Sequence, residues 1–145
     1  MELETLYPLV TDAIRRAEVL DELGAPGARQ AYLDVSLLEE RIARLLPQTD
    51  VEGVIARRGA VRAAIAAHEF RRATDLVTRY AAEGGIDGSV RAALIALGEE
   101  AASFVAQDEC SMTARYPQAS ARYGIAELRR FARAYYDQGA PLPIY

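Results

Sequence analysis

Arg62 and His68 are the two residues whose types and spacing best suit chemistry in this sequence. His68 is the only histidine among 145 residues, and it falls at the bend between two predicted helices. Five residues separate it from Arg62. On one continuous helix, six steps would set the two side chains roughly 120° apart. They therefore converge only if the helix ends between them or if a second subunit contributes one of them.

This spacing resembles the Arg-x4–6-His motif of the HEPN ribonucleases, which are all-helical proteins of similar size. The resemblance implies an RNA-cleaving toxin in which Arg62 and His68 act on the RNA phosphate and the 2′-hydroxyl. The sequence departs from the motif at Ala63, where that family usually has a polar residue. The other interpretation is structural: His68 continues the apolar line of Val61 and Ile65 and caps or packs at the bend. We expect the structural role and keep the ribonuclease as the alternative.

Carboxylates occur in adjacent pairs, Glu39-Glu40 and Glu99-Glu100. Neighbouring residues of a helix point in different directions, so neither pair forms a general acid–base couple. A di-iron site in a helical bundle needs Glu-x-x-His on two helices, and the sequence has one histidine and no such motif. We expect no metal site and no cofactor.

Residues 115–145 differ in charge from the rest of the chain. They hold five arginines against two acidic residues, a local net charge of +3, whereas the preceding residues carry −7. Arginine and tyrosine are favoured at protein interfaces, although they can also clamp and stack on single-stranded RNA or line a solvated face. The apolar residues 141–145 either pack on their own helices or enter a groove of a partner. The predicted partner-binding residues are Arg122, Arg129, Arg130, Arg133, Tyr135, Tyr136, Leu142, Ile144 and Tyr145.

The elements that would position these residues are all helical. Apolar residues recur with a helical period throughout, and no stretch alternates as a strand would. Helices are expected from residue 3 or 8 to 23, over 28–46, twice within 51–83, from 87 or 89 to 108, and over 119–138. Three consecutive pairs with short links predict an all-α, single-domain bundle or stack of five to six helices arranged as helical hairpins. The domain would cover 1–139, with an extended tail at 140–145.

The hairpin at 51–83 is the centre of this arrangement. Thr49 and Glu52 have the spacing of a capping box at its start. Its second half is similar to a tetratricopeptide repeat at His68-Glu69-Phe70 and Ala73, over this one hairpin. The apolar line of its first helix is predicted to be Val51, Val54, Ile55, Val61 and Ile65.

The pair Glu40 and Arg44 in the preceding helix is expected on its outer side. Gly98, inside the predicted helix that ends near 108, either weakens that helix or allows a neighbour to approach closely.

Composition limits the function and the location. A formal net charge of −4 gives no general attraction to nucleic acid or to an anionic membrane. All 17 basic residues are arginine, and asparagine is absent, which indicates a GC-rich, bacterial genome. One cysteine makes no internal disulfide, and no apolar run approaches the roughly 18 residues that span a bilayer. We expect a soluble, cytoplasmic protein without a signal peptide.

The polar residues are spread over the outer faces of the predicted helices, so we expect no cleft in which reactive groups meet. This pattern predicts a non-catalytic helical protein-interaction module: an adaptor, a chaperone-like protein or an assembly subunit. The partner would be a protein, including a second copy in a homodimer. The alternatives are the ribonuclease described above and a helical subunit of a nucleoprotein complex that uses the C-terminal arginines.

Overall fold

The computed structural model describes residues 2–115 of the chain, with side chains up to residue 107. This part forms five helices and contains no strand, which confirms the all-α prediction. The helices are α1 (Glu2–Glu22), α2 (Ala28–Leu45), α3 (Val51–Ala66), α4 (Phe70–Ala81) and α5 (Gly88–Arg115). The predicted helix at 119–138 and the tail at 140–145 lie outside the described residues. Within the described helices, none is both long and apolar enough to cross a bilayer.

Internal contacts divide the chain into two compact units, Met1–Ala102 and Ser103–Tyr145. The first unit holds α1 to α4 and the N-terminal part of α5. The prediction of one domain over 1–139 stays a prediction, because its last part is not described.

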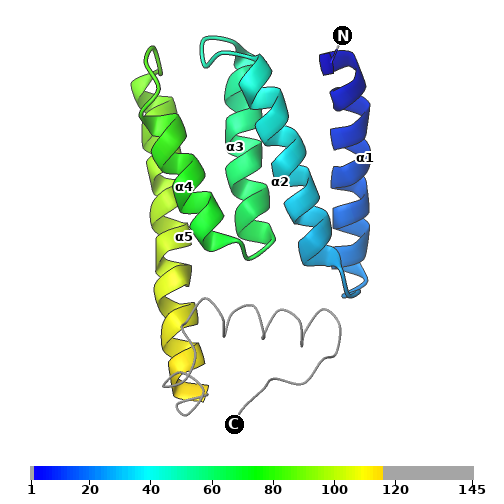
Figure 1. Ribbon diagram of the computed structural model, residues 1–145, viewed down its shortest axis with the longest axis vertical. Coiled ribbons are helices and arrows are strands. Elements are labelled where there is room, and N and C mark those ends of the chain that lie inside the picture. Colours follow the sequence, from blue (N-terminus) through cyan, green and yellow to red (C-terminus); the bar gives the residue numbers. More distant parts are fainter. Residues whose placement is uncertain (1, 116–145) are drawn as a thin grey trace. The chain divides into compact units, whose positions relative to one another are not determined.

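Helices α1 to α4 pack in chain order and follow one another from right to left in Figure 1. Among these four helices, close backbone contacts join α1 to α2, α2 to α3, and α3 to α4, and no other pair. This is the arrangement of consecutive helical hairpins that the periodicity predicted. It leaves α3 with packed neighbours on two sides.

Small residues form most of the buried surface of α3. Its buried residues are Gly53, Ala56, Arg57, Ala60, Val61, Ala63 and Ala64. Small side chains allow the helices on both sides to approach closely and still fill the space between them. The predicted apolar line of α3 is therefore wrong in part. Val51 and Ile55 are 73% and 59% exposed, because alanines and glycine occupy the sectors that face α2 and α4.

The core of the first unit includes side chains of α1 to α4 and of the N-terminal part of α5. Its largest fully buried apolar side chains are Leu6, Val61, Ile42, Leu76 and Leu94. Gly98 of α5 allows close packing on α4, since a Cβ there would lie 2.9 Å from Val77 Cγ1. Close approach is one of the two roles that the sequence predicted for this glycine.

The start of α3 differs from the predicted capping box. Asp50, not Thr49, is the N-cap residue, and its Oδ1 accepts a hydrogen bond of 2.9 Å from the backbone N–H of Glu52. A carboxylate at this position satisfies one of the free N–H groups of the first turn. In the same way, Asp87 accepts a 2.8 Å hydrogen bond from the backbone N–H of Ser89 at the start of α5.

Candidate functional site

His68 ends α3 through its backbone. It has a φ of 60°, in the left-handed region, and its N–H donates to the Ile65 carbonyl oxygen at 2.9 Å. The next N–H, of Glu69, donates to the Ala64 carbonyl oxygen at 2.9 Å. These two bonds make a Schellman motif with His68 at the position where glycine is usual. The imidazole lies beside the Phe70 ring, with 5.3 Å between centroids.

This geometry meets one condition for the predicted pair. Helix α3 ends at Ala66, between Arg62 and His68, and both side chains are exposed. The cap and the contact with Phe70 match one part of the structural interpretation of His68, whereas its exposed side chain does not continue the buried line of Val61. An action of the pair on RNA stays a prediction. The nine predicted partner-binding residues, from Arg122 to Tyr145, lie outside the described residues, and so their role stays a prediction too.

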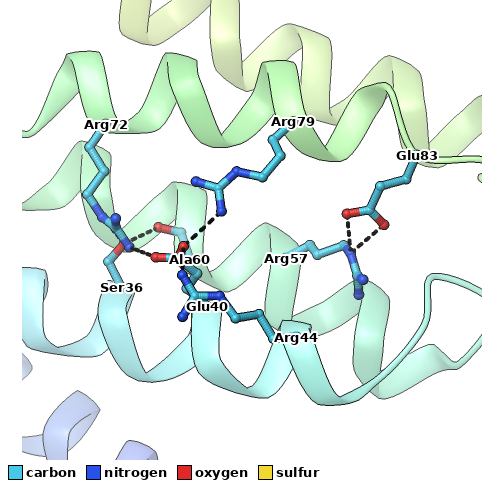
Figure 2. A network of polar contacts seen from close by, with 8 residues as sticks. All are labelled: Ser36, Glu40, Arg44, Arg57, Ala60, Arg72, Arg79 and Glu83. Atoms are coloured by element: carbon cyan, nitrogen blue, oxygen red, sulfur yellow. Dashed lines mark hydrogen bonds and ion pairs between the residues drawn. The ribbon is translucent and has the colours of Figure 1, made fainter.

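The most concentrated group of charges in the described residues surrounds Glu40 of α2, which is 4% exposed (Figure 2). Arg72 Nη2 of α4 donates to Glu40 Oε1 at 2.8 Å. Arg44 Nη2 and Arg79 Nη1 both donate to Oε2, at 2.8 and 3.0 Å. The Glu40–Arg44 pair exists, and Arg44 is exposed, but the predicted place on an outer face is wrong for Glu40, because two arginines of α4 cover its carboxylate.

Ser36 extends this group to α3. Its hydroxyl donates to the Ala60 carbonyl oxygen at 2.7 Å and accepts from Arg72 Nε at 3.1 Å. Arg72 therefore holds two buried oxygens of α2 at once. No sequence pattern indicates this contact, because Ser36 and Arg72 are 36 residues apart.

Glu40 is kept ionised by its partners. Burial alone would raise the pKa of its carboxyl, but hydrogen bonds from Arg72 and Arg79 and the positive charges of Arg72 and Arg44 outweigh burial and lower that pKa. Three guanidinium groups thus surround one carboxylate, leaving a local excess of two positive charges. Arg44 and Arg79 are also 65% and 52% exposed, so solvent reaches both.

A buried arginine, Arg57, lies close to this cluster (Figure 2). Arg57 of α3 is 6% exposed, and its Nε lies 3.1 Å from Glu83 Oε2. Its Nη1 donates to the carbonyl oxygens of Leu46 and Gly53, both at 2.9 Å. The guanidinium also lies over the ring of Tyr80, 5.5 Å from its centroid. Arg57 thus neutralises Glu83, and its hydrogen bond to Leu46 connects the α2–α3 loop to α3.

A pocket of about 420 Å³ lies between the end of α2 and α4. One part of its lining is apolar, and the other part holds Arg44, Arg79 and the Arg57–Glu83 pair. Its lining residues are Ala43, Arg44, Leu45, Leu46, Pro47, Arg57, Arg79, Tyr80 and Glu83. The pocket brings ion-paired arginine and glutamate side chains together, and His68 is not part of its lining, so the expectation that no cleft brings reactive groups together stays a prediction.

Tyr80 lines the pocket and is 4% exposed. Its buried hydroxyl has no hydrogen-bond partner among the described protein groups. A buried polar group without a partner costs on the order of 1–3 kcal/mol. Burial first, and then the charge of Glu40, raise the pKa of this hydroxyl, so it remains a neutral donor at physiological pH.

A different side of α3 carries the exposed apolar residues. Val51, Ile55, Arg58 and Arg62 are spaced at i, i+4, i+7 and i+11, which places them on one helical face. We call these four residues the α3 outer face. It combines two large apolar side chains with the exposed guanidinium of Arg62.

The described residues contain no group of three histidine, cysteine or acidic side chains arranged to hold a metal ion. No protein-family model, curated protein or solved structure matches this chain. Function is therefore inferred from its own residues.

Proposed function

We propose that this chain is a non-catalytic protein-interaction module, an adaptor or assembly subunit, that binds a protein partner through the α3 outer face. The single observation that carries the proposal is the exposure of Val51 and Ile55 on adjacent turns of α3. Large apolar side chains that share an exposed face are typical of interaction sites, whereas single scattered ones are not.

The arginines of this face support the same function. Apolar side chains beside arginine are the composition that protein interfaces favour at their centre. The fitting partner presents apolar side chains next to carboxylates. A second copy of the chain satisfies this condition, since residues 1–114 carry a net charge of −7. A homodimer is therefore the first assembly to test.

The proposal also includes a bacterial, cytoplasmic setting. It rests on the absence of lysine and asparagine, which fits a GC-rich genome, and on the single cysteine. The nine predicted partner-binding residues between Arg122 and Tyr145 would add a second contact region to the same module.

The test replaces Val51 and Ile55 together by glutamate in the full chain. Both side chains are exposed, so the fold should persist. The matched control replaces Leu9 and Val19 of α1, which are 47% and 49% exposed, by glutamate. We expect light scattering to show a dimer for the native chain and the control, and a monomer for the α3 variant.

If the native chain is monomeric, the same variants are compared for the proteins that co-purify with them from the host. Loss of a stoichiometric partner only in the α3 variant supports the module. If the α3 variant and the α1 control give the same result in light scattering and in co-purification, the proposed interaction through the α3 outer face is contradicted.

A ribonuclease remains the second candidate, favoured by the end of α3 between Arg62 and His68. It predicts that the purified chain cleaves single-stranded RNA and that Arg62→Ala and His68→Ala each abolish cleavage without loss of helicity. Cleavage that survives His68→Ala, or no cleavage by the native chain, removes this candidate.

A further inference from the structure

We propose that the pocket between α2 and α4 binds a small organic acid, with its carboxylate at Arg44 and Arg79 and its apolar body against the end of α2. This inference concerns a different side of the molecule from the α3 outer face, and it does not depend on the proposed function. Both arginines line the pocket and are more than half exposed, so an incoming anion can reach them.

Charge favours an anion here. Among the residues with described side chains, Arg44, Arg72 and Arg79 share Glu40 as their one carboxylate partner, while Glu83 is already neutralised by Arg57. The excess of two positive charges lies where Arg44 and Arg79 meet at Glu40 Oε2 (Figure 2). Each of these arginines donates one N–H to Glu40, and a guanidinium has five N–H groups. The donors for a second carboxylate are therefore present beside the first.

The shape of the anion follows from the same groups. Planar guanidinium groups match the planar fork of a carboxylate, and Arg44 and Arg79 each already donate one N–H to a carboxylate oxygen, Glu40 Oε2. Glu83 lines the same pocket and is 31% exposed on its side chain. Arg57 offsets the charge of Glu83 overall, but the partly exposed carboxylate of Glu83 still lines the pocket and opposes a dianion more strongly than a monoanion. A monocarboxylate therefore fits better than a phosphate.

The rest of the pocket fits an apolar body. Its volume of about 420 Å³ lies within the usual range of roughly 300–1,000 Å³ for ligand pockets and exceeds what a carboxylate alone would fill. Leu45, Leu46 and Pro47 supply an apolar wall. Tyr80 adds an aromatic side chain and a buried hydroxyl without a protein partner, which a ligand oxygen that reaches it would satisfy.

The experiment titrates the full chain with benzoate, with benzyl alcohol and inorganic phosphate as comparison probes. Binding is followed by amide chemical shifts in two-dimensional NMR spectra, at concentrations up to about 20 mM, which detect millimolar dissociation constants. We expect saturable binding of benzoate, shifts that centre on residues 43–47 and 79–83, and much weaker effects of the other two probes.

Variants assign the binding to the two arginines. Arg44→Gln combined with Arg79→Gln should weaken benzoate binding by about tenfold or more. The control is Arg41→Gln, also on α2; the Arg41 side chain is 50% exposed, and its Nη2 lies 2.8 Å from the carboxylate of Glu2. Thermal melts show whether each variant remains folded, and Arg79→Lys provides a milder variant if the double substitution unfolds the chain.

Three results would overturn the inference. They are no saturable shift with benzoate, an equal loss of binding in Arg41→Gln, and tighter binding of phosphate than of benzoate. None of these results depends on the oligomeric state, so they leave the proposed interaction module to its own test.

Discussion

Arg72 Nη2 lies 2.8 Å from Glu40 Oε1, and this ion pair joins α4 to α2, two helices without close backbone contact. The same guanidinium holds Ser36 Oγ through its Nε. The Arg72 side chain therefore extends from α4 to the buried carboxylate of Glu40 on α2, although α3 is the helix that packs between them in chain order. The pair acts as a cross-link between alternate helices, and its strength depends on both charges being present.

Replacement of Glu40 by glutamine should lower the free energy of unfolding by about 3 kcal/mol, because it leaves three arginines close together without their shared carboxylate. Urea denaturation at pH 7 measures this change. The control is Glu2→Gln, which removes the half-exposed pair with Arg41 and should cost less than about 1 kcal/mol. Similar losses in the two variants would show that Glu40 is no more important than a surface ion pair.

The stability of the chain should depend on pH through Glu39. Burial raises the pKa of its carboxyl from 4.5 to about 7, and its side chain lies against Gly59 of α3. Between these two pH values the folded state binds more protons than the unfolded state, so this contribution to stability is lost as the pH rises from 4.5 to 7.

Glu39→Gln should remove that dependence and stabilise the chain at pH 8 by on the order of 1 kcal/mol, a value reduced for the partial exposure of the side chain. Melting temperatures of both proteins at pH 5, 6, 7 and 8 test this. The difference between them should grow with pH, and a constant difference would contradict the prediction. The pH dependence that Glu40 contributes has the opposite sign: its pKa is lowered in the folded state, so its contribution to stability is lost as the pH falls.

The left-handed backbone at His68 gives a prediction about side-chain type. A β-branched residue rarely adopts a φ of 60°, so His68→Val should lower the free energy of unfolding by about 1–2 kcal/mol. His68→Gly should be at least as stable as the native chain, because glycine adopts this conformation without steric cost. Chemical denaturation of both variants measures the two effects. Equal stability of the valine and glycine variants would mean that the Schellman turn is not retained.

Gly53→Ala should destabilise the chain by about 2 kcal/mol, although alanine is the better helix former. A Cβ at Gly53 would overlap the Pro47 carbonyl oxygen and lie 3.1 Å from Arg57 Nη1. Gly88→Ala is the control, because a Cβ at Gly88, at the start of α5, would meet no neighbouring side chain or loop within 4 Å. It should change stability by less than about 0.5 kcal/mol. A stabilising effect of alanine at position 53 would disprove this close packing.

The number and order of the described helices could be predicted from periodicity and from Gly and Pro, because both act within a few turns of the chain. The burial of particular residues could not. Val51 and Ile55 are typical core residues, yet α3 has neighbours on two sides and small residues fill both contacts. A helical wheel identifies one stripe of large apolar residues, but it does not reveal that small residues of α3 pack against α2 on one face and α4 on another.

The Glu40 cluster could not be predicted for a related reason. The spacing of Glu40 and Arg44 indicates a solvent-exposed pair in any isolated helix. Its burial depends on Arg72 and Arg79, which lie 32 and 39 residues later in the chain. The pocket depends on the same contacts, together with Arg57 and Tyr80.

The consecutive packing of α1 to α4 has a consequence for synthesis on the ribosome. Each helix emerges next to the one it packs against, so hairpins can form in the order of translation. Glu40 is the exception, since two of its three partners belong to α4. Until α4 leaves the exit tunnel, Arg44 is the one of these three partners that can pair with Glu40 in the nascent chain. Once α4 has emerged, Arg72 and Arg79 pair with Glu40 as well and connect α4 to α2.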